Sequence, residues 1–487
     1  MSLKEMIPTL LNTWKSQQEL LAHNKILFNI YEGDLLTYVL QDLKKQLNEK
    51  SFEQIQHRIA PINVLKRLID KLSKIYAKCP VRELKNGNDK DQALFDFYKE
   101  SLDIDTTMNL SNEFFNLFKT CALEPFLDEG KPCLRVVPSD RFFVYSTDST
   151  NPLRPTHFVK IMGEVKKGDK TIVLFYGYTN DEFLAFDDSG EIVTEVMNKP
   201  EYAQLNGKNP FGKIPFIYIN RSKSELTPQK DTDTLCMTKL IPVLLSDLNY
   251  AVMFQSFSII YGINVNNEGL KMAPNTFWNL KSDDSTDKPP QLGTIKPEVD
   301  TDKVLNLVKT LLSLWMTTRN IKPGAMGDLT IDNAASGIAK VIDEMDTSED
   351  RSKQIPYFVK AESEFWDLII NHLHPVWIRN SDFERKKESF SSNISVSVRF
   401  PIQRPIVDSS KQIDDEDKKM QMGIQSKKGA LQELYPDWTE KQIEEKLLEV
   451  EQEHKEYALK LSTQNQSIPS QDVVTKGQSN STQMMNN

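Results

Sequence analysis

The amino-acid sequence predicts an α+β protein that is predominantly helical. Apolar residues recur every three or four positions over much of the first 118 residues and again after residue 235, which is typical of amphipathic helices. Short runs of aromatic and β-branched residues, which favour strands, are concentrated between Leu134 and Ile219. These two observations predict one compact mixed module within a mainly helical chain.

The clearest early helix lies between residues 64 and 75. Its apolar face consists of Val64, Leu65, Leu68, Ile69, Leu72 and Ile75. Pro80 ends the pattern, because proline is poorly tolerated inside a helix. The polar part of this helix is basic, and its residues are Lys66, Arg67, Lys71, Lys74 and Lys78. A solvated surface is the favoured interpretation of these basic residues, and contact with DNA is the alternative.

Four short runs predict strands in the middle of the chain. They cover residues 134–137, 142–145, 171–176 and 216–219. The sequence Asp187-Asp188-Ser189-Gly190 is typical of the turn of a hairpin, and Ile192-Val193 follows it.

Two long helices are predicted next, separated by an insert. The first runs from Leu235 to Ile260 and is kinked or restarted at Pro242, and the second covers residues 304–318. Residues 263–302 between them contain four prolines and several acidic residues. A loop begins near Pro323-Gly324, and a helix resumes with Ser336 as a possible N-cap.

The last part of the chain returns briefly to a strand and then becomes helical. Residues 395–400 alternate like a half-buried strand that Pro401 restricts to an edge. From Asp414 onward the sequence predicts charged helices, one capped by Ser426 and the next opened by a capping box at residues 439–442. Beyond about residue 461 the polar composition predicts disorder.

Composition limits the possible functions. The 487 residues allow about three domain-sized units or one extended subunit. A net charge of −9 and a pI near 5.4 argue against tight wrapping of nucleic acid, although they permit a conduit past which DNA slides. The four cysteines are far apart and are expected to be reduced and partly buried. No apolar run is long enough for a membrane span, and no signal peptide is recognised, so cytoplasmic synthesis is expected.

The chemical motifs do not support catalysis. Gly207–Lys213 resembles the start of a phosphate loop, but Ile214 replaces the expected Ser or Thr and Pro215 opposes the helix that must follow. A turn leading into a strand is therefore favoured there. His372 and His374 have the wrong spacing for two ligands on one helix face, so a helix end with incidental histidines is favoured.

Acidic pairs also lack a complete ligand set. Asp231 with Asp233, and Asp283 with Asp284, could offer carboxylates to a cation, but neither pair has the remaining ligands of a calcium loop. They are interpreted as loop and capping residues. The sequence predicts no catalytic residue, no metal and no cofactor.

Several local patterns resemble one known family. The matching patterns are Tyr31-Glu32-Gly33-Asp34, the helix from Ala60 to Lys71 that ends before Pro80, the strand-Pro-strand at residues 136–145, the turn at residues 209–216, Ser336-Gly337-Ile338-Ala339, Gly423–Ser426 and Asp437–Glu440. Their order along nearly the whole chain resembles the phage portal protein family, in the form found in long-tailed phages. Residues 263–302 match no pattern of the family.

The resemblance implies a portal fold with wing, stem, clip and crown regions, assembled as a ring. The implied regions are an N-terminal helical part of the wing at 1–125, a β-rich wing module at 126–225, a stem helix at 226–262, a clip at 263–302, a returning stem helix at 303–319, a tunnel loop at 320–335, a long wing helix at 336–385, a wing strand at 386–410, a crown at 411–460 and a disordered polar tail at 461–487.

The resemblance also implies particular roles for residues. Those of the tunnel loop, expected to face DNA in the channel, are Asn320, Lys322, Pro323, Gly324, Met326, Gly327, Asp328, Asp332 and Asn333. Arg319 and Lys322 are expected to be balanced by Asp328 and Asp332, so that contact with DNA stays loose. Stem packing is assigned to Leu240, Leu244, Leu248, Val304, Val308, Leu311 and Trp315.

The implied function is a dodecameric channel at one capsid vertex, used for genome packaging, DNA retention and ejection. The implied partners are other copies of the chain, the major capsid protein, the large terminase subunit, adaptor or head-completion proteins and double-stranded DNA, and no membrane. The implied location is the virion, after assembly in the host cytoplasm. Two alternatives stay open at this point: a nucleotide-dependent DNA-processing enzyme, supported only by Gly207–Lys213, and a different ring-shaped head-tail connector.

Overall fold

A computed structural model describes most of the chain in two compact units, Met1–Pro405 and Ile406–Asn487. The described residues are 2–167, 170–256, 259–263, 291–295, 301–319, 321, 337–380, 382–385, 388–401, 409–436 and 438–465. Helices account for 55% of the structure, which confirms the prediction of a predominantly helical α+β protein.

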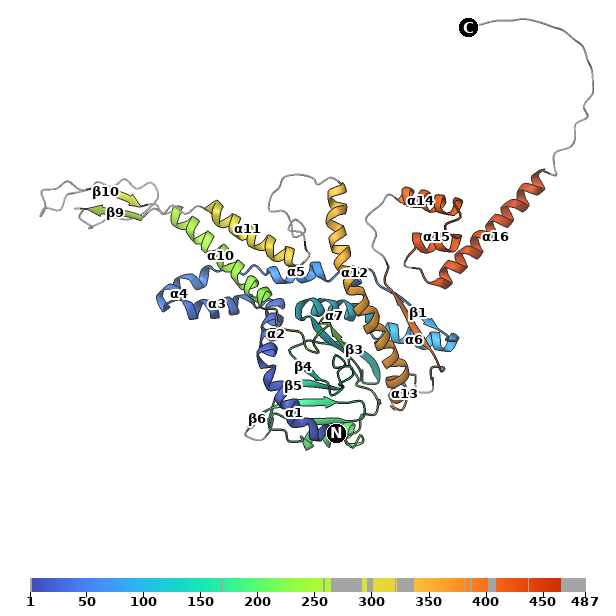
Figure 1. Ribbon diagram of the computed structural model, residues 1–487, viewed down its shortest axis with the longest axis horizontal. Coiled ribbons are helices and arrows are strands. Elements are labelled where there is room, and N and C mark those ends of the chain that lie inside the picture. Colours follow the sequence, from blue (N-terminus) through green and yellow to red (C-terminus); the bar gives the residue numbers. More distant parts are fainter. Residues whose placement is uncertain are drawn as a thin grey trace, which may run out of the picture. The chain divides into compact units, whose positions relative to one another are not determined.

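The first unit begins with helices and then alternates strands and helices (Figure 1). Its α-helices are α1 (Leu3–Ser16), α2 (Gln18–Tyr31), α3 (Leu35–Gln46), α4 (Glu49–Ile55), α5 (Val64–Leu72), α6 (Asp89–Ser101), α7 (Ile104–Phe118), α8 (Thr194–Met197), α9 (Pro200–Ala203), α10 (Thr232–Ser256), α11 (Thr301–Thr318), α12 (Gly337–Asp367) and α13 (His374–Trp377). Short 3₁₀ turns η1 (Gln56–Arg58) and η2 (Ile75–Ala77) follow α4 and α5, and a π-helical segment η4 (Leu368–Leu373) joins α12 to α13.

Among the described residues, the strands form four small antiparallel sheets. They are β1 (Val81–Lys85), β2 (Thr120–Asp128), β3 (Lys131–Val137), β4 (Phe142–Tyr145), β5 (His157–Lys167), β6 (Lys170–Tyr178), β7 (Phe183–Asp187), β8 (Ile217–Asn220), β9 (Ile259–Ile263), β10 (Gln291–Ile295) and β11 (Ser395–Arg399). Their orders are β4-β5-β6-β7, β3-β2-β8, β1-β11 and β10-β9. The four runs that predict strands lie in or at β3, β4, β6 and β8, so those predictions are confirmed.

Helix α1 covers the four-stranded sheet. Ser2 and Glu5 form a capping box that fixes its N-terminus. Its apolar side then buries Leu3, Met6, Ile7, Leu10 and Leu11 against Phe143, Val159, Phe175 and Phe186 of the sheet. This packing joins the first residues of the chain to the β-rich module.

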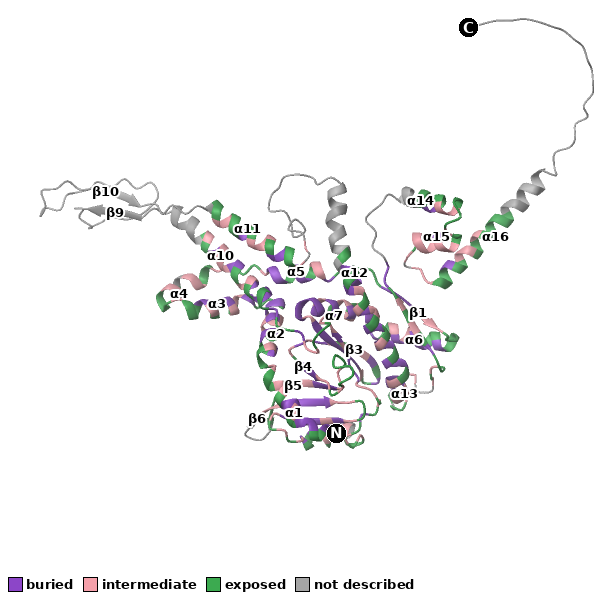
Figure 2. Cartoon of the chain, in the orientation of Figure 1, coloured by how far each residue is buried: buried purple, intermediate pink, exposed green. Residues whose placement is uncertain are grey.

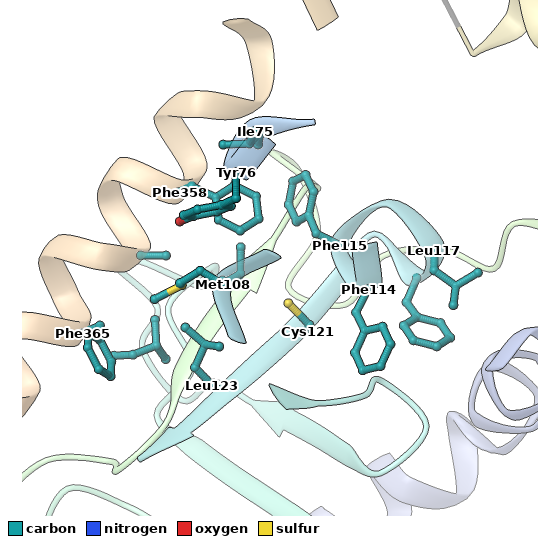
Figure 3. Close-up of a cluster of buried hydrophobic side chains, with 14 of the residues drawn as sticks. Ile75, Tyr76, Met108, Phe114, Phe115, Leu117, Cys121, Leu123, Phe358 and Phe365 are labelled. Atoms are coloured by element: carbon teal, nitrogen blue, oxygen red, sulfur yellow. The ribbon is translucent and has the colours of Figure 1, made fainter. Parts of the chain in front are cut away.

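The largest core lies where α7, α12, β2 and β8 meet. Figure 3 shows aromatic side chains from both helices gathered there, including Phe115 of α7 and Phe358 of α12. The ring of Phe358 packs edge-on against Tyr76 and Phe115, with centroids 5.7 and 5.3 Å away. Figure 2 shows the buried residues concentrated in this region.

Charged and amide side chains are buried inside the same core. Arg82 and Glu362 are almost completely buried and form an ion pair at 2.5 Å, and the Tyr76 hydroxyl donates to Glu362. Nearby, Gln354 of α12 accepts from Asn112 and Asn116 of α7. These contacts fix α12 to the body through specific partners as well as through apolar packing.

Three expectations need correction. Helix α10 continues through Pro242 as one helix and is not restarted there. Helix α16 of the second unit extends to Asn465, beyond the point where disorder was expected to begin. The four cysteines are free, but Cys79 and Cys236 are exposed and not partly buried, because the segments that carry them turn those positions outward.

The second unit contains α14 (Ser409–Gln421), α15 (Lys427–Leu434) and α16 (Glu440–Asn465). The Ser426 hydroxyl accepts from the Gly429 amide, which confirms the predicted N-cap of α15. Thr439 and Gln442 exchange the two hydrogen bonds of the predicted capping box. Ile443 is completely buried and anchors the small core of this unit.

Candidate functional site: the paired helices α10 and α11

Helices α10 and α11 run side by side and extend from the body (Figure 1). A small apolar cluster holds them together and against α5: Ile241 of α10, Val308 and Trp315 of α11, and Val64 and Leu68 of α5 are its buried members. Strands β9 and β10, which pair with each other, lie between the two helices in the sequence. The chain therefore leaves the body along α10 and returns along α11.

The residues assigned to stem packing fall into different environments. Val308 and Trp315 are buried in the cluster, and Leu244 is half-buried against it. Leu248, Val304 and Leu311 are also half-buried. Leu240, by contrast, is 40% exposed. These positions therefore differ in how much apolar surface each leaves for a further contact.

Two apolar residues that the sequence reasoning missed are more exposed still. Leu307 and Leu314 of α11 are 49% and 61% exposed, and their separation of seven residues places them on one face of the helix. The apolar spacing that predicts the buried face of α11 also runs through Leu307 and Leu314, which form a second apolar stripe. The subunit itself leaves it uncovered.

The two helices are tied to each other where they join the body. Arg319, just after α11, forms an ion pair with Asp231 at 2.6 Å and with Asp233 at 3.0 Å, and it donates to the Thr234 hydroxyl. Lys119, after α7, lies 3.6 Å from Asp231. We call this group of charges the root cluster: Lys119, Asp231, Asp233 and Arg319.

Charge pairing determines the protonation of the root cluster. Burial by itself would raise the pKa of Asp231, but the hydrogen bond from Arg319 and the positive charges of Arg319 and Lys119 hold it well below its usual range. Burial by itself would lower the pKa of Arg319. The hydrogen bond of Arg319 to Asp231 outweighs burial, so the pKa of Arg319 is raised. Both groups are therefore charged at neutral pH.

Arg319 thus has a different role from the one expected. From the sequence, Arg319 is expected to act with Lys322 as a loop charge balanced by Asp328 and Asp332. In the structure it is bound to Asp231 and Asp233, which the sequence reasoning treated as capping residues. A capping role is also present, because Asp231 accepts from the Thr234 amide near the start of α10.

The residues assigned to the tunnel loop lie outside the described part of the chain. They are Asn320, Lys322, Pro323, Gly324, Met326, Gly327, Asp328, Asp332 and Asn333. The structure does describe the approach to this segment. The Ile321 amide donates to the carbonyl of Met316, five residues earlier, a bond typical of a Schellman-type helix end. The Ile321 side chain packs against the apolar cluster. Helix α12 begins on the other side at Gly337.

The two motifs rejected for catalysis are structural. Residues 209–216 form turns that lead into β8, and no helix follows Lys213, which pairs with Asp367 at 2.6 Å. The turn predicted from the failed phosphate loop is therefore confirmed. His374 uses both ring nitrogens, one with the Tyr98 hydroxyl at 2.8 Å and one with the Glu388 carbonyl at 3.0 Å. It stands at the junction of η4 and α13, so the chain stays helical through Pro375 to Trp377 and the helix end predicted at these histidines lies a few residues later.

Two searches of the described residues give negative results. None of their His, Cys, Asp and Glu side chains gather in a group of three or more that could hold a metal ion. No helix among them is both long enough and apolar enough to cross a membrane.

Comparison with known proteins identifies one family. A family model described as "Phage portal protein, SPP1 Gp6-like" matches residues 12–457. The match includes α10, α11, the root cluster and the segment between α11 and α12. No curated protein matches the chain.

Proposed function

The chain belongs to the SPP1 Gp6-like family of phage portal proteins, and from this membership we propose that its copies form a closed ring at one vertex of the capsid. The expected ring is a dodecamer. Double-stranded DNA enters through its channel during packaging, is retained there and leaves through it at ejection. The family membership, which extends over residues 12–457, is the observation that carries this proposal.

In this proposal each part of the chain has a separate role. Helices α10 and α11 form the stem around the channel, and residues 263–302 form the clip, which meets the large terminase subunit and later the adaptor or head-completion proteins. The wing contacts the major capsid protein, and residues 411–460 form the crown. Residues 320–335 form the tunnel loop, in which Lys322, Asp328 and Asp332 leave little net charge toward DNA.

The packing of the two helices supports a stem within a ring. Val308 and Trp315 are already buried inside the subunit, whereas Leu240, Leu307 and Leu314 keep apolar surface exposed to solvent. Neighbouring copies in a closed ring would cover such surface with the same contact repeated around the axis. ATP hydrolysis is assigned to the terminase, and the portal acts as a structural and mechanical part.

The ring can be tested by native mass spectrometry and negative-stain microscopy of the purified full chain. We expect a closed ring with a mushroom-shaped side view, because the paired helices extend from a wider body. A flat ring would favour the connector alternative. A chain that stays monomeric at high concentration and under virion-like conditions would contradict the proposal, since a channel requires a closed ring.

The tunnel loop can be tested separately. Shortening the segment from Ala325 to Asp332 should impair DNA packaging and leave ring assembly intact, because the stem contacts lie in α10 and α11. The measurement is the amount of packaged DNA per particle, with ring formation checked on the same variant. Normal DNA filling would remove the assignment of this segment while leaving the ring proposal in place.

A further inference from the structure

A cleft lies between strand β8 and helix α12, away from the paired helices. Its volume is about 830 Å³, which is within the range of ligand-binding clefts. Every residue of β8 lines one side of it. The opposite side is one face of α12, formed by Lys353, Pro356, Tyr357, Lys360, Ala361 and Glu364, whose spacings of three and four residues place them together.

Strand β8 is an edge strand, because among the described residues no second strand pairs with it on the side away from β2. It is the last strand of the sheet β3-β2-β8 and pairs only with β2 in that sheet. The Arg221 amide donates to the Lys119 carbonyl. This bond shows which residues of β8 direct their backbone amides and carbonyls toward β2. Because hydrogen-bonded and non-bonded pairs alternate in an antiparallel ladder, Ile217 and Ile219 bond to β2, whereas the amides and carbonyls of Tyr218 and Asn220 point away from it.

Those outward backbone groups are available for another strand. Within the described part of the chain, no hydrogen bond reaches the backbone amide or carbonyl of Tyr218 or Asn220. An edge strand with unpaired amides and carbonyls is a template for an extended segment, and this mode of recognition is called strand addition. Because β8 has four residues, an added strand would pair with it over a short region.

The cleft is basic although the chain is acidic. Five basic side chains and one acidic side chain line it, in a protein whose net charge is −9. Lys353 and Lys360 pair with Glu349 and Glu364 of α12, and Lys213 pairs with Asp367. Such solvent-accessible pairs contribute little. Among the described residues, Arg154 and Lys223 have no acidic partner. The charges of Arg154 and Lys223 are therefore free to attract an acidic ligand.

We propose that this cleft binds an acidic, extended peptide segment of a partner protein, which adds as a strand to the outer edge of β8. The backbone of the segment would pair with Tyr218 and Asn220, and its carboxylates would face Arg154 and Lys223. Duplex DNA fits these observations less well, because the open amides and carbonyls of β8 match a peptide backbone. The proposal stands independently of the ring.

The test uses the purified full chain and a fluorescent eight-residue peptide of alternating glutamate and valine. Two further versions carry N-methyl groups, either on the odd or on the even residues, so that each blocks one edge of the peptide. Strand addition predicts that one N-methylated version loses binding and the other keeps it. Hydrogen exchange should also slow at the Tyr218 and Asn220 amides when the unmodified peptide binds.

A charge-reversal pair tests the electrostatic part of the proposal. The double variant Arg154→Glu with Lys223→Glu should weaken peptide binding by about tenfold or more. The matched control is Lys199→Glu with Lys208→Glu, two exposed lysines outside the cleft, which should leave the affinity nearly unchanged. Circular dichroism of both variants verifies that the fold is retained.

Four outcomes would overturn the proposal. The first is binding that tolerates both N-methylated peptides, and the second is equal binding of a lysine-valine peptide. A third is displacement of the peptide by a short DNA duplex, which would assign the cleft to nucleic acid. The fourth is binding to the single subunit but not to assembled rings, which would mean that a second copy of the chain covers β8.

Discussion

Buried charged residues connect segments that are far apart in the sequence. Glu362 of α12 receives Arg82 from β1 and Tyr76 from η2, and the side chains of both members of the ion pair are at most 2% exposed. Removing two charges from water is costly, so such a pair is stable only when both partners and their hydrogen bonds are present. Truncation of Glu362 leaves the buried Arg82 without its main partner, although Asp105 still lies 2.6 Å from it.

We therefore predict that Glu362→Ala destabilises the protein strongly. The expected loss is about 3–5 kcal/mol, because Arg82 would stay buried without its main partner. Chemical denaturation followed by tryptophan fluorescence measures the change. Glu364→Ala is the control on the same helix, since Glu364 is only half-buried and its pair with Lys360 spans 3.8 Å. Equal effects of the two substitutions would contradict the structural role of Glu362.

The root cluster predicts a dependence on acid. The pKa of Asp231 is lower in the folded protein than its ordinary value of about 3.9, so its contribution to stability is full above that pH and is lost as the pH falls below it. His23 of α2 also faces Asp231, and burial lowers the pKa of this histidine, although Asp231 itself acts in the opposite direction. At neutral pH the ion pairs of Asp231 with Arg319 and Lys119 are therefore intact.

The expected result is that Asp231→Asn lowers the melting temperature most near pH 7. The difference from the natural sequence should shrink toward pH 3, where Asp231 itself becomes protonated in the unfolded chain. Thermal melting at a series of pH values measures it. Asp233→Asn serves as the control, because the side chain of Asp233 is 65% exposed. A difference that stays constant with pH would argue against this role of Asp231.

The exposed face of α11 leads to a prediction about assembly. Leu307→Lys combined with Leu314→Lys places two charges on a stripe that is solvent-exposed in the subunit. The subunit should fold normally, because exposed positions tolerate charge, but ring formation should be lost if neighbours cover this face. Analytical ultracentrifugation gives the oligomeric state. Asp302→Lys with Asn306→Lys is the matched control, because both residues are exposed on α11 but lie about a quarter turn or more around the helix from Leu307 and Leu314.

Elements with a regular apolar pattern could be predicted from the sequence, and those with mixed patterns could not. Helix α11 and strand β4 were identified from such patterns, with bounds that agree closely. Strand β2 was missed because Glu124 and Pro125 interrupt it. Glu124 is paired with Arg135 and Lys160 at 2.6 and 2.7 Å, and Pro125 lies beyond the residues that β8 pairs with, where β2 has one neighbour.

Long-range polar contacts explain most of what the sequence could not reveal. Polar and charged residues interrupt the apolar pattern of α12, yet Arg351, Gln354 and Glu362 are all buried. Their partners come from other elements, such as the carbonyl of Pro401 that accepts from Arg351. The same limit applies to the root cluster, because nothing near Arg319 in the sequence points to Asp231. Only the folded chain brings these groups together.

At the scale of the molecule, the order of weak motifs was more informative than any one motif. Each matching pattern is short, but their succession indicated the portal family, and the family match confirms it. The contacts between copies of the chain could not be predicted from sequence motifs in the same way. Leu307 and Leu314, which are proposed to contact a neighbouring copy, look in the sequence like ordinary apolar residues of an amphipathic helix. Only their exposure in the folded subunit sets them apart from the buried ones.

The division into two units predicts how the chain tolerates truncation. Within the described part of the chain, the five larger hydrophobic clusters consist of residues from Met1–Pro405. A chain that ends at Pro405 should therefore keep the melting temperature of this unit. A chain that ends at Asn393 is the control, because it lacks β11, the only partner of β1 in its sheet, and should be less stable. Calorimetry compares the two, and equal melting of both truncated chains would contradict the assignment.

The position of the root cluster has a consequence for how this protein can diverge. Arg319 and Asp231 are 88 residues apart in sequence, yet their ion pair brings the start of α10 and the end of α11 to the same point of the body. The entropy of closing a loop grows only slowly with its length, by about 0.6 kcal/mol for each doubling. Insertions, deletions or exchanges in the segment between α10 and α11 should therefore change the free energy of unfolding of the body little. If that segment is the proposed clip, a lineage could acquire a new docking partner by replacing it alone, while the anchored part of the protein stays unchanged.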